Sequence, residues 1–109
     1  MIRILVAFES DYRAYRDMLA VGIRILRLRS EVETANLETV EEEVKRFEPQ
    51  VLICSLPEPV DSGDCAARVE LSMNPTRPNR ISIGRRYCEW TNPTLEDLLG
   101  TIDKVEEFL

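Results

Sequence analysis

Residues 2–8, Ile-Arg-Ile-Leu-Val-Ala-Phe, form a nearly continuous apolar run in which only Arg3 is polar. Residues 51–55, Val-Leu-Ile-Cys-Ser, form a second run of the same kind. Strands that are apolar on both faces are typical of parallel sheets covered by helices on each side. We therefore expect 2–8 and 51–55 to be central strands of a parallel sheet.

Two helical patterns and a short strand lie between these runs. Residues 31–35 alternate charged and small apolar side chains and predict an edge-type strand. On either side of it, apolar residues recur at helical spacing. The first stripe comprises Tyr15, Met18, Leu19, Gly22, Ile23 and Leu26, and the second comprises Leu37, Val40, Val44 and Phe47. We expect Ser10 or Asp11 to cap the start of the first helix and Asn36 to cap the start of the second. Pro49 is expected to end the second helix. The order is therefore β-α-β-α-β.

The pattern changes after residue 55. Residues 57–67 contain two prolines, a glycine and two aspartates, and they show no helical stripe. Residues 68–73 and 81–83 alternate apolar and polar side chains, as strands do. The linker 74–80 between them contains two prolines and is too short for a crossover helix, so we expect an antiparallel hairpin.

A helix is expected at the end of the chain. Thr94 and Asp97 have the spacing of a capping box. The apolar stripe that follows comprises Leu95, Leu98, Leu99, Ile102, Val105 and Leu109. The sequence thus predicts one α/β domain over residues 1–109, a three-layer sandwich of flavodoxin-like or receiver-like type, with β-α-β-α-β followed by a β-hairpin and a C-terminal helix.

Composition excludes several classes of function. The chain has 109 residues, 44% of them apolar and 31% charged, with a net charge of −6. This is enough apolar material for one core, and the negative charge makes nucleic acid an unlikely general partner. The first residues lack the cationic lead of a secretory signal, and no run approaches the roughly 20 apolar residues of a membrane span. We expect a cytosolic protein with no membrane partner.

Residue types that carry much enzyme chemistry are missing. There is no histidine, which removes Ser-His-Asp and Cys-His catalysis and imidazole acid–base work. Cys54, Cys65 and Cys88 are widely spaced without a CxxC motif, and we interpret them as reduced thiols. We expect no metal site, no cofactor and no enzymatic activity.

The first 57 residues resemble a receiver domain of a bacterial response regulator, of the CheY-like family. The run 3–6 followed by an acidic turn resembles the first strand of the family, and 48–53, Glu-Pro-Gln-Val-Leu-Ile, resembles its third. The segment 92–99, Asn-Pro-Thr-Leu-Glu-Asp-Leu-Leu, resembles its lysine-proline turn and last helix. About two-thirds of the chain is covered, and the resemblance implies a signalling role.

Carrying the family's roles across position by position reveals losses. The family's pair of magnesium-binding acids corresponds to Phe8 and Glu9, so one carboxylate remains. The phospho-accepting aspartate corresponds to Ser55, and the phosphate-contacting lysine corresponds to Asn92 before Pro93. Aspartyl phosphorylation needs a carboxylate nucleophile, magnesium and a cation, so we predict a degenerate receiver without phosphoryl transfer.

Two sets of residues are candidate binding sites. Glu9, Ser55 and Asn92, with Asp11 nearby, are expected near the carboxyl ends of the strands, where doubly wound sheets bind ligands. A basic, aromatic-flanked hairpin provides the second set, which could contact phosphates or an acidic partner or only protect a sheet edge. Its members are Arg77, Arg80, Arg85, Arg86 and Trp90. Acidic helices elsewhere in the chain make a homodimer a further candidate assembly.

The leading hypothesis is a phosphorylation-independent, receiver-like regulatory module that binds an unidentified protein. The alternative is a small-ligand or anion sensor that uses the crevice at the strand ends. Nucleic-acid binding through the arginine hairpin is a weaker third hypothesis.

Overall fold

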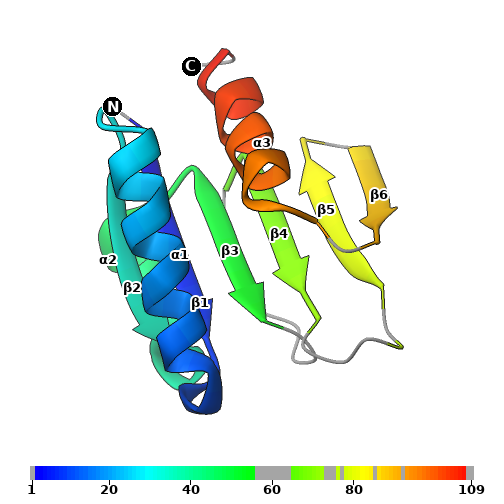
Figure 1. Ribbon diagram of the computed structural model, residues 1–109. Coiled ribbons are helices and arrows are strands. Elements are labelled where there is room, and N and C mark those ends of the chain that lie inside the picture. The colour runs from blue at the N-terminus through cyan, green and yellow to red at the C-terminus, as the bar shows by residue number, and fades with distance from the viewer. Residues whose placement is uncertain are drawn as a thin grey trace.

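The computed structural model describes residues 2–55, 65–72, 76, 78–84, 86–91 and 93–107. These residues form a mixed sheet of six strands with three α-helices (Figure 1). The strands are β1 (Arg3–Phe8), β2 (Glu31–Asn36), β3 (Val51–Ser55), β4 (Ala67–Leu71), β5 (Asn79–Ile83) and β6 (Arg86–Trp90). The helices are α1 (Arg13–Leu26), α2 (Val40–Phe47) and α3 (Leu95–Glu107). None of the helices in the described part is long and apolar enough to cross a bilayer.

The strand order is β2-β1-β3-β4-β5-β6. Strands β2, β1, β3 and β4 are parallel neighbours, whereas β4–β5 and β5–β6 are antiparallel pairs. The order 2-1-3-4 is the start of a flavodoxin-like arrangement, and the antiparallel end departs from it. The predicted hairpin is confirmed, and its first strand, β4, lies beside β3 and extends the parallel sheet.

Helices cover both faces of the sheet, as the two apolar runs predict. Figure 1 shows α1 and α3 in front of the sheet and α2 behind it. The larger core lies on the α1 and α3 side, where Ile4, Val6 and Ile53 are completely or almost completely buried. Leu5 and Leu52 point to the other face and pack with α2. Alternate residues of one strand therefore belong to two different cores.

The helices α1 and α3 lie close together on the front face. A Cβ atom added to Gly22 of α1 would come within 3.3 Å of a methyl carbon of Leu95 in α3, so this position favours a residue without a side chain. Arg27, just after α1, donates two hydrogen bonds of 2.7 Å to the carboxylate of Asp103 in α3. This bidentate pair fixes the end of α1 against α3.

Helix ends follow the sequence in part. Thr94 and Asp97 form the predicted capping box: each backbone N–H donates to the other side chain, at 2.8 and 3.2 Å. The expected side-chain caps at Ser10 or Asp11 and at Asn36 are wrong, because a 3-10 turn precedes both α1 and α2 and no side-chain cap hydrogen bond forms. The predicted end before Pro49 is confirmed.

Strand β6 is an element that the sequence reasoning missed. It pairs with β5 so that Ile83 lies opposite Arg86, which leaves residues 84 and 85 as a two-residue connection. Gly84 has a φ of 58°, the conformation that tight hairpins favour at their first central residue. The glycine and the aromatic residues after it were the signal for this strand.

Candidate functional site

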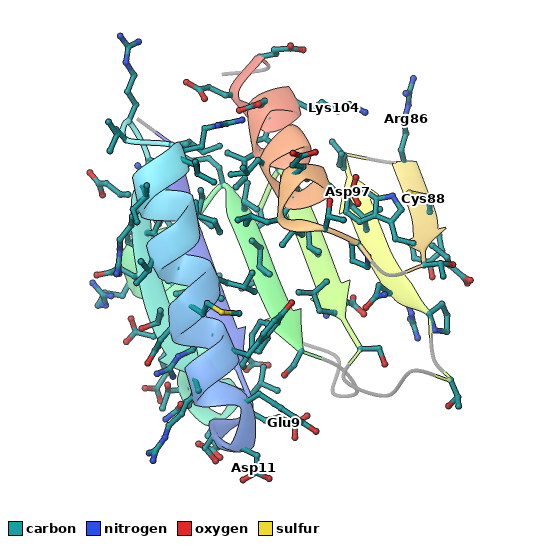
Figure 2. The ribbon with its side chains drawn as sticks, viewed as in Figure 1. Glu9, Asp11, Arg86, Cys88, Asp97 and Lys104 are labelled. Carbon is teal, nitrogen blue, oxygen red and sulfur yellow. The ribbon has the colours of Figure 1, made fainter. Side chains whose placement is uncertain are left out.

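The first candidate site lies where β1 and β3 end. Figure 2 shows Glu9 and Asp11 at this end of the molecule, beside the start of α1. The parallel pairing of β1 with β3 brings their carboxyl ends together, so Glu9 and Ser55 meet as predicted. Asn92, the third predicted member, lies outside the described residues.

Ser55 has a structural bond at this site. Its side chain is completely buried, and its Oγ accepts a hydrogen bond of 3.1 Å from the backbone N–H of Glu9. This bond satisfies a backbone donor at the point where β1 ends, and an unsatisfied buried donor would be costly. The Ser55 hydroxyl therefore joins two strand ends, and the chain has no histidine that could activate it as a nucleophile.

Phe8 fills the position next to Glu9. Its ring is completely buried in the front core, and its centroid lies 5.6 Å from that of Tyr15 in α1. Aromatic pairs at this separation stabilise the packing beyond the area they bury. An apolar ring thus occupies the place where the receiver resemblance would require a carboxylate.

These residues do not fit a magnesium ion. Magnesium requires several oxygen ligands in octahedral geometry, and Glu9 is the one carboxylate that remains of the expected pair. Among the described residues, no three acidic, cysteine or histidine side chains gather closely enough to hold a metal. In the described part of the strand ends, the Ser55–Glu9 hydrogen bond joins β1 to β3, and Phe8 and Ser55 occupy the positions that correspond to acids in the receiver resemblance.

The second candidate site is the basic hairpin. Arg77 and Arg85 lie outside the described residues, and Arg80, Arg86 and Trp90 lie on β5 and β6. Residues directly opposite each other in a sheet share a face. Because Arg80 lies opposite Glu89, and Arg86 lies opposite the inward-facing Ile83, the two arginines are on opposite faces. 

Trp90 is also not a free surface aromatic. It lies opposite Asn79 and packs partly buried against the front core. The Asn79 side chain donates a hydrogen bond of 3.2 Å to the Trp90 carbonyl oxygen. Figure 2 shows Arg86 projecting from β6 at the edge of the sheet, away from Glu9 and Asp11. The described members of the hairpin set therefore present two separate surfaces.

A polar group that the sequence reasoning missed lies behind the sheet. Arg68 and Glu70 of β4 point to the α2 side, and Arg68 Nε lies 3.0 Å from Glu70 Oε1. The approach has the distance of an ion pair without the alignment of a hydrogen bond, so this Nε has no hydrogen-bond acceptor among the residues that the structure describes. Cys54, adjacent on β3, is buried, and burial raises the pKa of its thiol to about 12. The thiol of Cys54 is therefore protonated and unreactive at neutral pH.

Comparison of the chain with protein-family models, curated proteins and solved structures gives no match. Function must therefore be inferred from the residues themselves.

Proposed function

We propose that this chain is a cytosolic, receiver-like regulatory module that acts by protein contact and does not depend on phosphorylation. The proposal combines the receiver resemblance of the sequence with a parallel sheet that begins in flavodoxin-like order. Under it, the scaffold is retained as a rigid platform, and the surface of that platform carries the function.

One observation carries the proposal. At the ends of β1 and β3, the Phe8 ring is buried in the core and the Ser55 hydroxyl accepts the Glu9 N–H. A receiver places a metal-binding acid and an acceptor aspartate at these two points. Phosphoryl transfer needs a nucleophilic carboxylate and a bound cation there, and a phenyl ring and a buried hydroxyl supply neither.

A tagged pull-down from native lysate, analysed by mass spectrometry, tests the proposal. Arg80→Glu and Arg86→Glu reverse charge on opposite faces of the β5–β6 hairpin, and Lys45→Glu, on the exposed side of α2, is the matched control. We expect one enriched protein that Lys45→Glu retains and one of the two arginine variants loses. An eluate in which no protein depends on either arginine would contradict the proposal.

A ligand screen separates this function from the sensor alternative. Under the proposal, nucleotides and small anions do not raise the melting temperature of the protein. Reproducible stabilisation by one of them, abolished by Glu9→Ala, would move the function to the strand ends. Ser55→Ala also removes the hydrogen bond that Ser55 accepts from Glu9. The melting temperature of this variant with each ligand must therefore be compared with that of the same variant without ligand.

A further inference from the structure

The outward face of α1 is apolar. Its sheet side buries Leu19, Ala20 and Ile23. The opposite side carries Met18 and Ile25, which are 63% and 64% exposed. The outward side of a surface helix is ordinarily polar. Contiguous exposed apolar side chains of this kind mark interaction sites.

This apolar face is wider than two residues. Val21 is 49% exposed and lies between Met18 and Ile25, and Ala14 extends the face by one turn. Tyr15 and Leu26 border it on the side toward α3. We call Ala14, Met18, Val21 and Ile25 the α1 face. Figure 1 shows α1 in front of the sheet, with none of the drawn helices or strands covering it.

Two members of the α1 face, Met18 and Ile25, are placed symmetrically along the helix. Met18 and Ile25 lie at equal distances along α1 from the midpoint between Val21 and Gly22. If two copies pack antiparallel about a two-fold axis through that midpoint, Met18 of each copy lies level with Ile25 of the other. Such an interface is isologous, so one patch serves both sides.

Charges beside the α1 face suit this antiparallel arrangement. Asp17 and Arg24 are both exposed and lie on the same flank of α1, the flank near Val21. In the two-fold pair, Asp17 of one copy comes within about 3 Å, measured along the helix axis, of Arg24 of the other. The axis repeats this contact, so two ion pairs flank the interface. A parallel pair would place the two charges on opposite flanks.

Within one copy, both residues make hydrogen bonds that the dimer would exchange for the contact between copies. Asp17 accepts a hydrogen bond of 2.9 Å from Arg16 Nε, and its side chain is 58% exposed. Arg24 donates through Nη2 to the Val32 carbonyl oxygen of β2, at 2.8 Å. That bond draws the guanidinium toward the edge of β2, so the Arg24 side chain must leave Val32 to pair with Asp17 of the other copy.

We propose that two copies of this chain associate through their α1 faces as an antiparallel, two-fold symmetric dimer. The dimer does not depend on the proposed function, because it needs no external partner and uses neither the strand ends nor the β5–β6 hairpin. Apolar contacts provide the attraction, and the Asp17–Arg24 pairs select the antiparallel direction.

Sedimentation velocity over a range of protein concentrations tests the dimer. The wild-type mass is expected to rise toward twice the chain mass of 12.6 kDa. Ile25→Asp places a charge within the α1 face, level with Met18 of the other copy, and should leave a monomer. Tyr87→Asp is the matched control: Tyr87 is 57% exposed but lies on β6, so this variant should still dimerise. A wild-type monomer at every concentration, or equal disruption by both variants, would overturn the proposal.

Charge exchange tests the direction of packing. Asp17→Arg and Arg24→Asp should each raise the dimer dissociation constant on the order of tenfold, and the double variant should restore it. Circular dichroism verifies that each variant is folded, since Arg24→Asp also loses the bond to Val32. A double variant no better than either single variant would refute the antiparallel pairing.

Disulfide trapping gives a readout that does not depend on affinity. In a Cys88→Ser background, Val21→Cys should form an intermolecular disulfide on mild oxidation, because the two copies of residue 21 meet at the axis. Tyr15→Cys should not, because its two copies lie about 20 Å apart. The reverse result would refute the register. A monomer whose α1 face instead captures a different protein would assign the face to that partner and overturn self-association.

Discussion

Phe8→Asp restores a carboxylate at the position where a receiver would hold magnesium, and we expect it to be strongly destabilising. Phe8 is completely buried, and removing a buried phenyl ring costs about 3–5 kcal/mol. The new carboxyl would be desolvated, so its pKa would rise and its ionisation would cost more. Against a total stability of roughly 5–15 kcal/mol for a domain, the variant should be marginally folded at neutral pH.

The matched control is Phe8→Ala, which removes the ring without adding a charge. A carboxyl whose pKa is raised by folding makes the folded state less stable as the pH rises above the pKa that the carboxyl has in the unfolded chain. The difference in free energy of unfolding between Phe8→Asp and Phe8→Ala should therefore become smaller toward acid pH. Urea unfolding followed by circular dichroism, with and without magnesium chloride, measures both effects. Wild-type stability in Phe8→Asp, or stabilisation by magnesium that Phe8→Ala does not show, would refute the structural role of this ring.

Three further predictions concern helix ends and charge. Thr94→Ala removes half of the capping box and should lower the free energy of unfolding by about 1 kcal/mol in urea titrations; an unchanged midpoint would contradict the cap. Glu48, at the end of α2, has a φ of 51°, so Glu48→Gly should raise stability by about 0.5–1 kcal/mol, and a loss would show that its side chain matters more than its backbone. The hydrogen bonds from Arg27 lower the pKa of Asp103 below its ordinary value of 3.8. The ionised pair therefore stabilises the fold at neutral pH. This stabilisation is lost as the pH falls through the lowered pKa and the carboxylate becomes protonated. Asp103→Asn should therefore melt earlier than wild type at pH 7 and equally at strongly acid pH, and a constant difference across pH would argue against the ion pair.

Most of the sheet could be predicted from the sequence because its central strands are apolar on both faces. The runs 2–8 and 51–55 became β1 and β3, and the short proline-containing linker indicated the antiparallel pair β4–β5. The place of this pair in the sheet, with β4 beside β3, was not predictable. The alternation of polar and apolar residues shows which side chains share a face of a strand, but not which strand lies next to it. Strand β6 was missed because its burial pattern is that of an exposed edge strand.

The helix α1 shows where periodicity fails. The predicted buried stripe included Met18 and Leu26, which are exposed, and omitted Ala20, which is buried. Apolar residues occupy most of the circumference of α1, so their spacing does not define one inward direction. Arg16 is half-buried and reaches the edge of β2, where it bonds the side-chain oxygen of Asn36 at 2.9 Å. Its long side chain can lie along the sheet with its charge at the rim.

The candidate strand-end site was predictable in position but not in chemistry. Parallel strands bring their carboxyl ends together, which placed Glu9 beside Ser55. The sequence did not reveal that the Ser55 hydroxyl accepts a backbone N–H, because this bond depends on the register between β1 and β3. The hairpin arginines Arg80 and Arg86 illustrate the same limit. They belong to one basic segment of the sequence, but the pairing of β5 with β6 places them on opposite faces of the sheet.

The most direct test of the account is incubation of the protein with acetyl phosphate and magnesium, followed by intact mass spectrometry. An active receiver domain treated in parallel shows that the reaction works. The account predicts that this chain gains no phosphoryl group, because the strand ends carry a buried ring and a bonded hydroxyl. Stoichiometric incorporation of one phosphoryl group, lost in Glu9→Gln, would contradict it.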